Sequence, residues 1–199
     1  KIKLPEKMLS TDKAYTWEEI EKWLERISKF SEEINVQLSD IQIKGTAKLD
    51  GFAGYDDGKK LYTRGDGNKG SDISRVFQRG LGILNDSERG QGPGEIVVKR
   101  SYFEDHLSND FEYPRNFQAS LIKEKELDKF ARDAIDAKAA LFVPFKQLPF
   151  WKGNIDEFKN QFLDIVIMLE EGVDFDIDGV VFEIVNPELK EFMGSNRKF

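Results

Sequence analysis

The chain has 199 residues, of which 39% are hydrophobic and 34% charged, a composition typical of a folded domain with one sizeable core and a charged surface. It has no cysteine and one histidine, which excludes disulfides, thiolate zinc sites and an imidazole metal cluster. Any metal is therefore expected to be magnesium, held by carboxylates and by phosphates of a ligand. The formal net charge of −7 argues against strong duplex DNA binding by this chain alone, because nonspecific affinity comes from neutralising phosphates.

No apolar run approaches the roughly 20 residues needed to span a bilayer, and the first residues show no signal-peptide pattern. A cytoplasmic location without membrane contact is expected. Short basic stretches such as Lys123 to Lys125 are more typical of a solvated surface than of a binding patch.

The first half of the chain changes from a helical to a β-like pattern. Thr16 and Glu19 are spaced as a capping box, which predicts a helix beginning after Thr16. Its apolar residues recur at helical spacing: Ile20, Trp23, Leu24, Ile27, Phe30 and Ile34. Residues 41–64 alternate as strands do, and Asp57-Gly58 predicts a hairpin turn. Lys48 is therefore expected to end one strand beside a hairpin.

A glycine-rich loop over 65–70 precedes a short helix that we expect Ser71 to cap. A strand is predicted over Glu95–Lys99, followed by a helix in which Ser101 and Glu104 have capping-box spacing.

The remaining elements alternate in type. The polar segment 124–140 is expected to be helical, and 140–145 a buried strand. Asn154 and Glu157 open a long helix, and a final strand covers 176–185. The inward residues expected on that helix are Phe158, Phe162, Ile165, Met168 and Leu169.

The stretch most informative about chemistry is Thr46-Ala47-Lys48-Leu49-Asp50-Gly51, followed by Thr63-Arg64-Gly65-Asp66-Gly67. A lysine two residues before an aspartate, closed by glycine on a β-rich segment, is one way to present a nucleophilic amine to a phosphate. In isolation the pattern is equally typical of a surface turn, because Asp-Gly is a strong turn signal.

The order of the surrounding segments gives the pattern its meaning. Met8–Asp12 lies upstream, and four segments follow in turn: Thr63–Gly67, Gly94-Glu95, Pro114-Arg115-Asn116 and Phe175–Val181. In this order the series resembles the adenylation domain of the NAD-dependent DNA ligases, over nearly the whole chain.

The resemblance implies an α+β covalent nucleotidyltransferase fold, with antiparallel sheets flanked by helices, as a single domain over residues 1–199. It implies that Lys48 attacks NAD to form lysyl-AMP, with Asp50 and Asp178 orienting the lysine and helping to hold Mg²⁺. In the full protein this step serves the sealing of nicked duplex DNA.

The nucleotide site implied by the resemblance has further members. Glu95 would hold ribose hydroxyls, and Arg64 and Arg115 would lie near phosphate, which a forked guanidinium suits. Phe142 or Phe145 would stack on the purine. Ser10, in the upstream segment, completes the expected nucleotide-binding set.

This chain departs from the family at several cationic and base-reading positions. Thr46 stands where the family has a glutamate that reads the adenine amine, and Glu183 where it has a lysine close to the nucleotide. Together these two residues would read the adenine amino group from the opposite strand; the alternative is that Glu183 points to solvent at a degenerate site. Two family arginines are replaced, one by Ile122 and one near Glu170 or Glu171.

The chain also lacks the family's N-terminal domain that recognises nicotinamide mononucleotide and its C-terminal oligonucleotide-binding barrel, so we expect either a fragment or a minimal natural protein. Three hypotheses follow. The first is an NAD-dependent DNA ligase adenylation domain. The second is a relative that uses ATP or joins RNA. The third is a catalytically decayed module kept for interaction.

Overall fold

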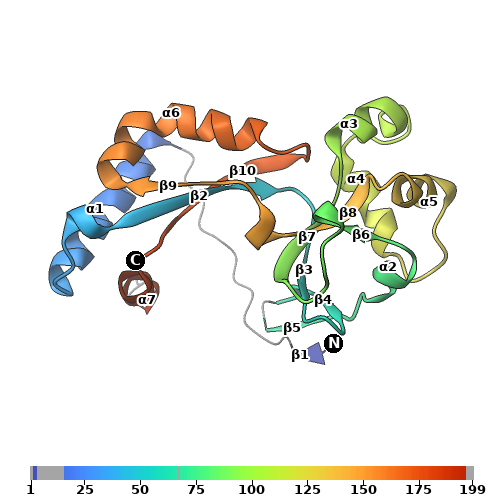
Figure 1. The fold of residues 1–199 in the computed structure, drawn as a ribbon, viewed down its shortest axis with the longest axis horizontal. Helices are drawn as coiled ribbons and strands as arrows, with labels where there is room; N and C mark the ends of the chain where they lie inside the picture. Colours follow the sequence, from blue (N-terminus) through green and yellow to red (C-terminus); the bar gives the residue numbers. More distant parts are fainter. Residues whose placement is uncertain (1, 4–15, 67, 196–199) are drawn as a thin grey trace. The chain divides into compact units, whose positions relative to one another are not determined.

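A computed structural model describes residues 2–3, 16–66 and 68–195. The chain divides into two compact units. Unit 1 comprises Lys1–Ser10, Lys48–Leu148 and Val173–Asp178, and unit 2 comprises Thr11–Ala47, Pro149–Gly172 and Gly179–Phe199. Each unit contains its own β-sheet with helices packed on it (Figure 1). This mixture of helices and mainly antiparallel sheets confirms the expected α+β class, while one domain over 1–199 remains a prediction.

Unit 1 is built on a five-stranded sheet in the order β4-β3-β7-β8-β6. Its strands are β3 (Phe52–Asp56), β4 (Leu61–Thr63), β6 (Gly82–Ile83), β7 (Gly92–Val98) and β8 (Ala140–Pro144). All neighbours are antiparallel except β6 and β8, which are parallel. A small second sheet pairs β1 (Ile2–Lys3) with β5 (Lys69–Gly70).

Short helices cover the sheet of unit 1. They are α2 (Arg75–Gln78), α3 (Arg100–Tyr102), α4 (Pro114–Gln118) and α5 (Lys129–Asp136), with a π-helical turn over Phe103–Leu107 and 3-10 turns over Leu84–Asp86, Ala119–Ile122 and Phe145–Gln147. Their apolar faces close a core around Phe117 and Phe142, which are both fully buried.

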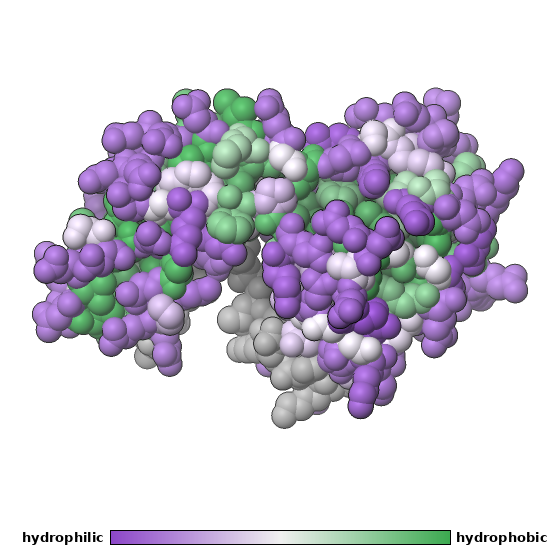
Figure 2. Space-filling view, viewed as in Figure 1, coloured by the Kyte–Doolittle hydropathy of each residue, from purple (hydrophilic) through white to green (hydrophobic). Residues whose placement is uncertain are grey.

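Most of a three-stranded sheet in the order β10-β2-β9 belongs to unit 2; its strands are β2 (Gln42–Leu49), β9 (Phe150–Asn154) and β10 (Ile177–Ile184). The end of β2 from Lys48 and the start of β10 up to Asp178 belong to unit 1. The helices of unit 2 are α1 (Trp17–Glu33), α6 (Ile155–Glu171) and α7 (Pro187–Ser195). Residues of all three helices join one buried cluster with the sheet, in which the rings of Trp23 and Phe158 meet edge to face. Hydrophobic side chains reach the surface over α6 (Figure 2), where Leu163 is 73% exposed.

Most local signals in the sequence are confirmed. Thr16 caps α1 by accepting a hydrogen bond from the backbone of Glu19, and Asn154 with Glu157 forms the capping box of α6. Asp57-Gly58 connects β3 to β4, with Gly58 in the left-handed region at φ 94°. These signals act within a few residues, so they do not depend on the rest of the fold.

Four expectations are wrong. Ser71 does not cap a helix: its backbone amide and carbonyl pair with Thr63, and α2 begins only at Arg75. Ser101 bonds to Asp174 rather than capping a helix. Met168, expected inside, is 49% exposed, and α7 was not anticipated. The helix expected over 124–140 is confined to α5.

Within the described part of the chain, the helices are all too short or too polar to cross a membrane.

Candidate functional site

Lys48 lies one residue before the end of β2. Burial alternates along this strand, so Ala47 and Leu49 are buried while the Lys48 side chain is partly exposed. The chain then turns through Asp50 and Gly51 into β3. A Cβ at Gly51 would collide with the carbonyl oxygen of Ile96, so only glycine permits this close approach to β7. The Asp-Gly pair therefore fixes where the lysine strand ends.

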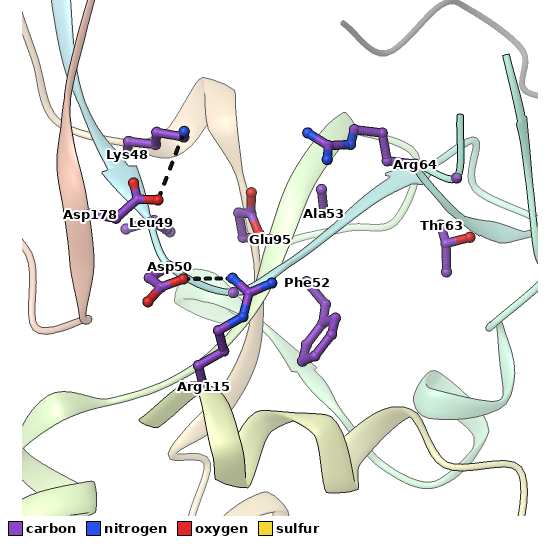
Figure 3. A pocket seen from close by; sticks show the side chains of 12 residues that line it. Lys48, Leu49, Asp50, Phe52, Ala53, Thr63, Arg64, Glu95, Arg115 and Asp178 are labelled. Carbon is purple, nitrogen blue, oxygen red and sulfur yellow. Dashed lines mark hydrogen bonds and ion pairs between the residues drawn. The ribbon is translucent and has the colours of Figure 1, made fainter. Parts of the chain in front are cut away.

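The side chains around Lys48 enclose a cavity of about 340 Å³ in unit 1, a size within the range of small-molecule sites. The lining residues are Lys48, Leu49, Asp50, Gly51, Phe52, Ala53, Thr63, Arg64, Gly65, Glu95, Arg115 and Asp178. Figure 3 shows Lys48 and Arg64 extending toward the cavity from opposite sides, with Glu95 between them. The sequence-predicted residues Lys48, Asp50, Arg64, Glu95, Arg115 and Asp178 are thus brought together.

Two ion pairs organise the charged side chains of this cavity. Asp178 Oδ2 lies 3.8 Å from Lys48 Nζ, and Arg115 Nη1 donates to Asp50 Oδ1 at 2.8 Å (Figure 3). The Arg115 guanidinium also lies 5.6 Å from the centre of the Phe52 ring. The amine and the guanidinium are therefore each held next to a carboxylate.

A buried glutamine fixes the turn that follows Lys48. Gln118 is fully buried, donates through Nε2 to the carbonyl oxygen of Asp50 and accepts a bond from the backbone amide of Val98. It links the Asp50 turn to β7 through one side chain. Sequence analysis did not identify Gln118 or Phe52 as part of the site; the only signal was their position next to Asp-Gly and Pro-Arg-Asn.

Glu95 is the most strongly perturbed acid of the cavity. Burial raises the pKa of Glu95 from 4.5 to about 8, opposed by the positive charge of Arg64 and reinforced by the negative charge of Asp178. Its Oε2 is buried, and the described residues supply no hydrogen-bond partner for it. The carboxyl is therefore mainly protonated at neutral pH, so it can donate a hydrogen bond as well as accept one.

Arg64 follows β4 at the start of the glycine-rich loop. Its backbone amide donates to the carbonyl oxygen of Ala53, which ties the loop to β3. Gly65 adopts φ 54°, and a Cβ there would collide with the carbonyl oxygen of Lys69. The loop therefore turns tightly at Gly65.

A family model of the NAD-dependent DNA ligase adenylation domain matches residues 1–137. This chain belongs to that family. The curated relatives of the adenylation domain include the DNA ligases of Ruthia magnifica subsp. Calyptogena magnifica and Vesicomyosocius okutanii subsp. Calyptogena okutanii, both 62% identical over 199 residues. The DNA ligase of Shewanella baltica is 50% identical over 198 residues. All three alignments cover the whole chain, but 32%, 32% and 31% of the respective relatives, so the chain spans about a third of their length.

Two further positions of the adenylation domain, Thr46 and Glu183, belong to unit 2. Thr46 pairs with Phe150 across β2 and β9. Glu183 Oε2 accepts a hydrogen bond from Lys190 Nζ of α7 at 2.8 Å. The acid that replaces the family lysine thus has an ammonium partner from the next helix. Ser10 lies outside the described residues.

The expectation for Phe142 is not supported. This residue is fully buried in the core of unit 1, where its ring meets that of Phe77 edge to face. A ring enclosed by protein has no face left for a base, so Phe142 has a packing role. The alternative, Phe145, is 37% exposed.

Among residues 2–3, 16–66 and 68–195, no three His, Cys, Asp or Glu side chains are close enough together to hold a metal ion. Asp50 and Asp178 each have a cationic partner, Arg115 and Lys48. The donor set therefore does not fit a metal caged by protein alone.

Proposed function

We propose that Lys48 is the nucleophile that takes AMP from NAD to form a lysyl-AMP intermediate, the first step of DNA ligation. One observation carries the proposal: an amine near the end of β2 shares a cavity of about 340 Å³ with two guanidinium groups and with the buried carboxyl of Glu95, whose Oε2 has no hydrogen-bond partner among the described residues. Membership of the adenylation domain family supports the same chemistry.

In this step, the unprotonated Lys48 nitrogen attacks the phosphorus of the adenylyl group. The new bond is nitrogen to phosphorus, and the bond from that phosphorus to the bridging oxygen breaks. Nicotinamide mononucleotide leaves with the bond's electron pair, and the proton lost by the amine passes to solvent water. Asp178, 3.8 Å from the amine, directs the nitrogen toward the cavity.

The other side chains of the cavity bind and orient the nucleotide. The guanidinium groups of Arg64 and Arg115 stabilise the negative charge that gathers on phosphate oxygens. Arg115 uses one of its five N–H donors on Asp50, which leaves others for phosphate. Glu95 is mainly protonated in the ligand-free cavity, and its Oε2 has no hydrogen-bond partner there among the described residues. When the nucleotide binds, this carboxyl forms a hydrogen bond with a ribose hydroxyl.

We expect magnesium to bind together with the nucleotide substrate. Mg²⁺ commonly keeps several waters and binds through one or two carboxylates plus substrate phosphates. When bound, it neutralises phosphate charge. The protein's own contribution here is the orientation of the amine and of the nucleotide.

The wider function is that of the longer relatives, which are named DNA ligases. We assign residues 1–199 to the adenylation domain of such an enzyme, acting on nicked duplex DNA in the cytoplasm. With a net charge of −7, this domain relies on the remainder of the protein for most contacts with DNA phosphates.

A second candidate, a catalytically decayed module, is favoured by particular residues. The family positions occupied by Thr46 and Ile122 lack the polar reach of glutamate and arginine, and Glu183 is committed to Lys190. This reading predicts that no nucleotide forms a covalent adduct. A relative that uses ATP or joins RNA is a further alternative, and it predicts an adduct with ATP or sealing of RNA ends.

Intact-mass analysis separates these alternatives. The full gene product is incubated with NAD or ATP and Mg²⁺, alongside a Lys48→Ala variant as the matched control. A mass increase of one AMP group with NAD, absent in Lys48→Ala, is the expected result. No adduct with either donor would overturn the proposal, and an adduct with ATP alone would favour the alternative of a relative that uses ATP. Sealing assays with nicked DNA and nicked RNA then assign the polymer.

A further inference from the structure

The segment that delivers Asp178 to Lys48 is held by residues to which no role has been assigned. This segment, the 174–176 strap, consists of Asp174, Phe175 and Asp176. It runs between the Asp50 turn and the junction of β7 with α3, and it ends two residues before Asp178. All of these residues belong to unit 1.

Backbone hydrogen bonds hold the strap on both sides. The amide of Asp50 donates to the carbonyl oxygen of Asp176 at 2.9 Å, and the amide of Arg100 donates to the carbonyl oxygen of Asp174 at 2.8 Å. Lys99 and Phe175 form an antiparallel bridge. Phe175 is buried in a cluster that includes Leu49, so the strap and the lysine strand also share apolar packing.

Side chains from the start of α3 complete the attachment. Arg100 Nη2 donates to the carbonyl oxygen of Phe175 at 2.6 Å. Ser101 donates through its backbone amide to Asp174 Oδ1 at 3.1 Å and through Oγ to Asp174 Oδ2 at 2.5 Å. The strap is therefore bonded through both its backbone and its first side chain.

Arg100 also acts through its positive charge, which lowers the pKa of Asp176. The carboxylates of Asp50, Asp176 and Asp178 are near enough to repel one another, and the pKa of Asp176 is raised by burial and then by Asp50, with Arg100 opposing the shift. Arg115 pairs with Asp50 and Lys48 with Asp178, and the positive charge of Arg100 offsets part of the repulsion at Asp176.

We propose that Arg100, supported by Ser101 and Asp174, is a positioning residue for lysine adenylylation: it holds the 174–176 strap so that Asp178 directs the Lys48 amine into the cavity. Arg100 does not touch the reacting atoms, since it acts through the strap and Asp178. The inference rests on the proposed function of Lys48.

Single-turnover adenylylation of the full gene product tests the inference. Mass spectrometry follows lysyl-AMP formation with NAD and Mg²⁺, which yields a rate constant and an amplitude. In Arg100→Ala we expect the rate constant to fall about 10-fold or more, because small displacements of a reacting group are costly. The amplitude and the NAD concentration for half-maximal rate should stay within about twofold, since the nucleotide contacts are intact. A protein that merely unfolds would lose amplitude instead.

Three comparisons sharpen the result. Ser101→Ala, which keeps the arginine, should lower the rate constant in the same direction by a smaller factor. Arg132→Ala removes an arginine that also donates to a backbone carbonyl of unit 1, that of Arg79, and should leave the rate constant unchanged. In an Asp178→Asn background, Arg100→Ala should have no further effect, because both changes act on the same contact.

Unchanged rate constants in Arg100→Ala and Ser101→Ala, an equal loss in Arg132→Ala, or additive losses with Asp178→Asn would overturn the inference. In each of these cases the wild-type protein still forms lysyl-AMP, so the proposed function stands. Absence of lysyl-AMP in the wild-type protein would overturn the proposed function, and the positioning role would fall with it.

Discussion

Replacement of Glu95 by glutamine tests the electrostatics of the cavity. Burial raises the pKa of Glu95 from its ordinary value of 4.5 to about 8. The folded state therefore retains a proton that the unfolded chain releases between these two values. The stability from this group is fully present below pH 4.5 and is lost as the pH rises toward 8. Glutamine has nearly the same shape and does not ionise.

The size of the effect follows from the two pKa values. A difference of one unit corresponds to about 1.4 kcal/mol, so a shift from 4.5 to about 8 bounds the loss at about 5 kcal/mol across the window. Water entry and side-chain relaxation reduce the cost of a buried charge, so we expect about 2–4 kcal/mol. For a protein of this size, 1 kcal/mol corresponds to roughly 2–4 °C in Tm.

The assay is thermal unfolding of the ligand-free chain and of Glu95→Gln at pH 5, 7 and 9. The two proteins should have similar Tm values at pH 5, and the Tm of the variant should exceed that of the wild type by roughly 4–16 °C at pH 9. Glu112→Gln, at an exposed position, controls for the loss of one surface carboxylate. A wild-type minus variant difference in Tm that stays constant from pH 5 to pH 9 would show that Glu95 is not held in an ion-excluding site.

Three further outcomes are expected. Lys48→Ala should abolish the AMP adduct and leave the melting curve intact; an adduct of unchanged yield, seen by intact mass, would place the nucleophile elsewhere. Glu183→Lys places a like charge next to Lys190 and removes a hydrogen-bond acceptor, so it should weaken AMP binding as measured by isothermal titration. Adding Thr46→Glu should partly restore that binding. Stronger AMP binding by Glu183→Lys alone would instead indicate an impaired ligase domain. The 199-residue chain alone should react with NAD very slowly and should not seal nicked DNA in a gel assay, because it spans only about a third of the length of the DNA ligases it matches; efficient sealing would contradict this.

Local sequence signals were sufficient for several elements. The capping residues Thr16 and Asn154 and the turn at Asp57-Gly58 act through contacts within three residues, so they could be read without knowledge of the fold. The same signals failed at Ser71, whose backbone amide and carbonyl both bond to Thr63, so that this residue continues a strand-like pairing instead of starting a helix. A residue that could cap a helix instead forms hydrogen bonds with the groups that the tertiary fold brings near it, as Ser101 does with Asp174.

The candidate site divides in the same way. The sequence by itself determined that Lys48 ends a strand and that Asp50-Gly51 turns the chain, and the order of motifs determined the family. Only the tertiary structure decided that Asp178, far along the chain, lies 3.8 Å from the amine and that Phe142 belongs to the core. It also decided that Glu95 is buried enough to hold its proton. Caps and turns are short-range, whereas ion pairs, desolvation and packing depend on segments that are far apart in the sequence and meet only when the sheets have formed.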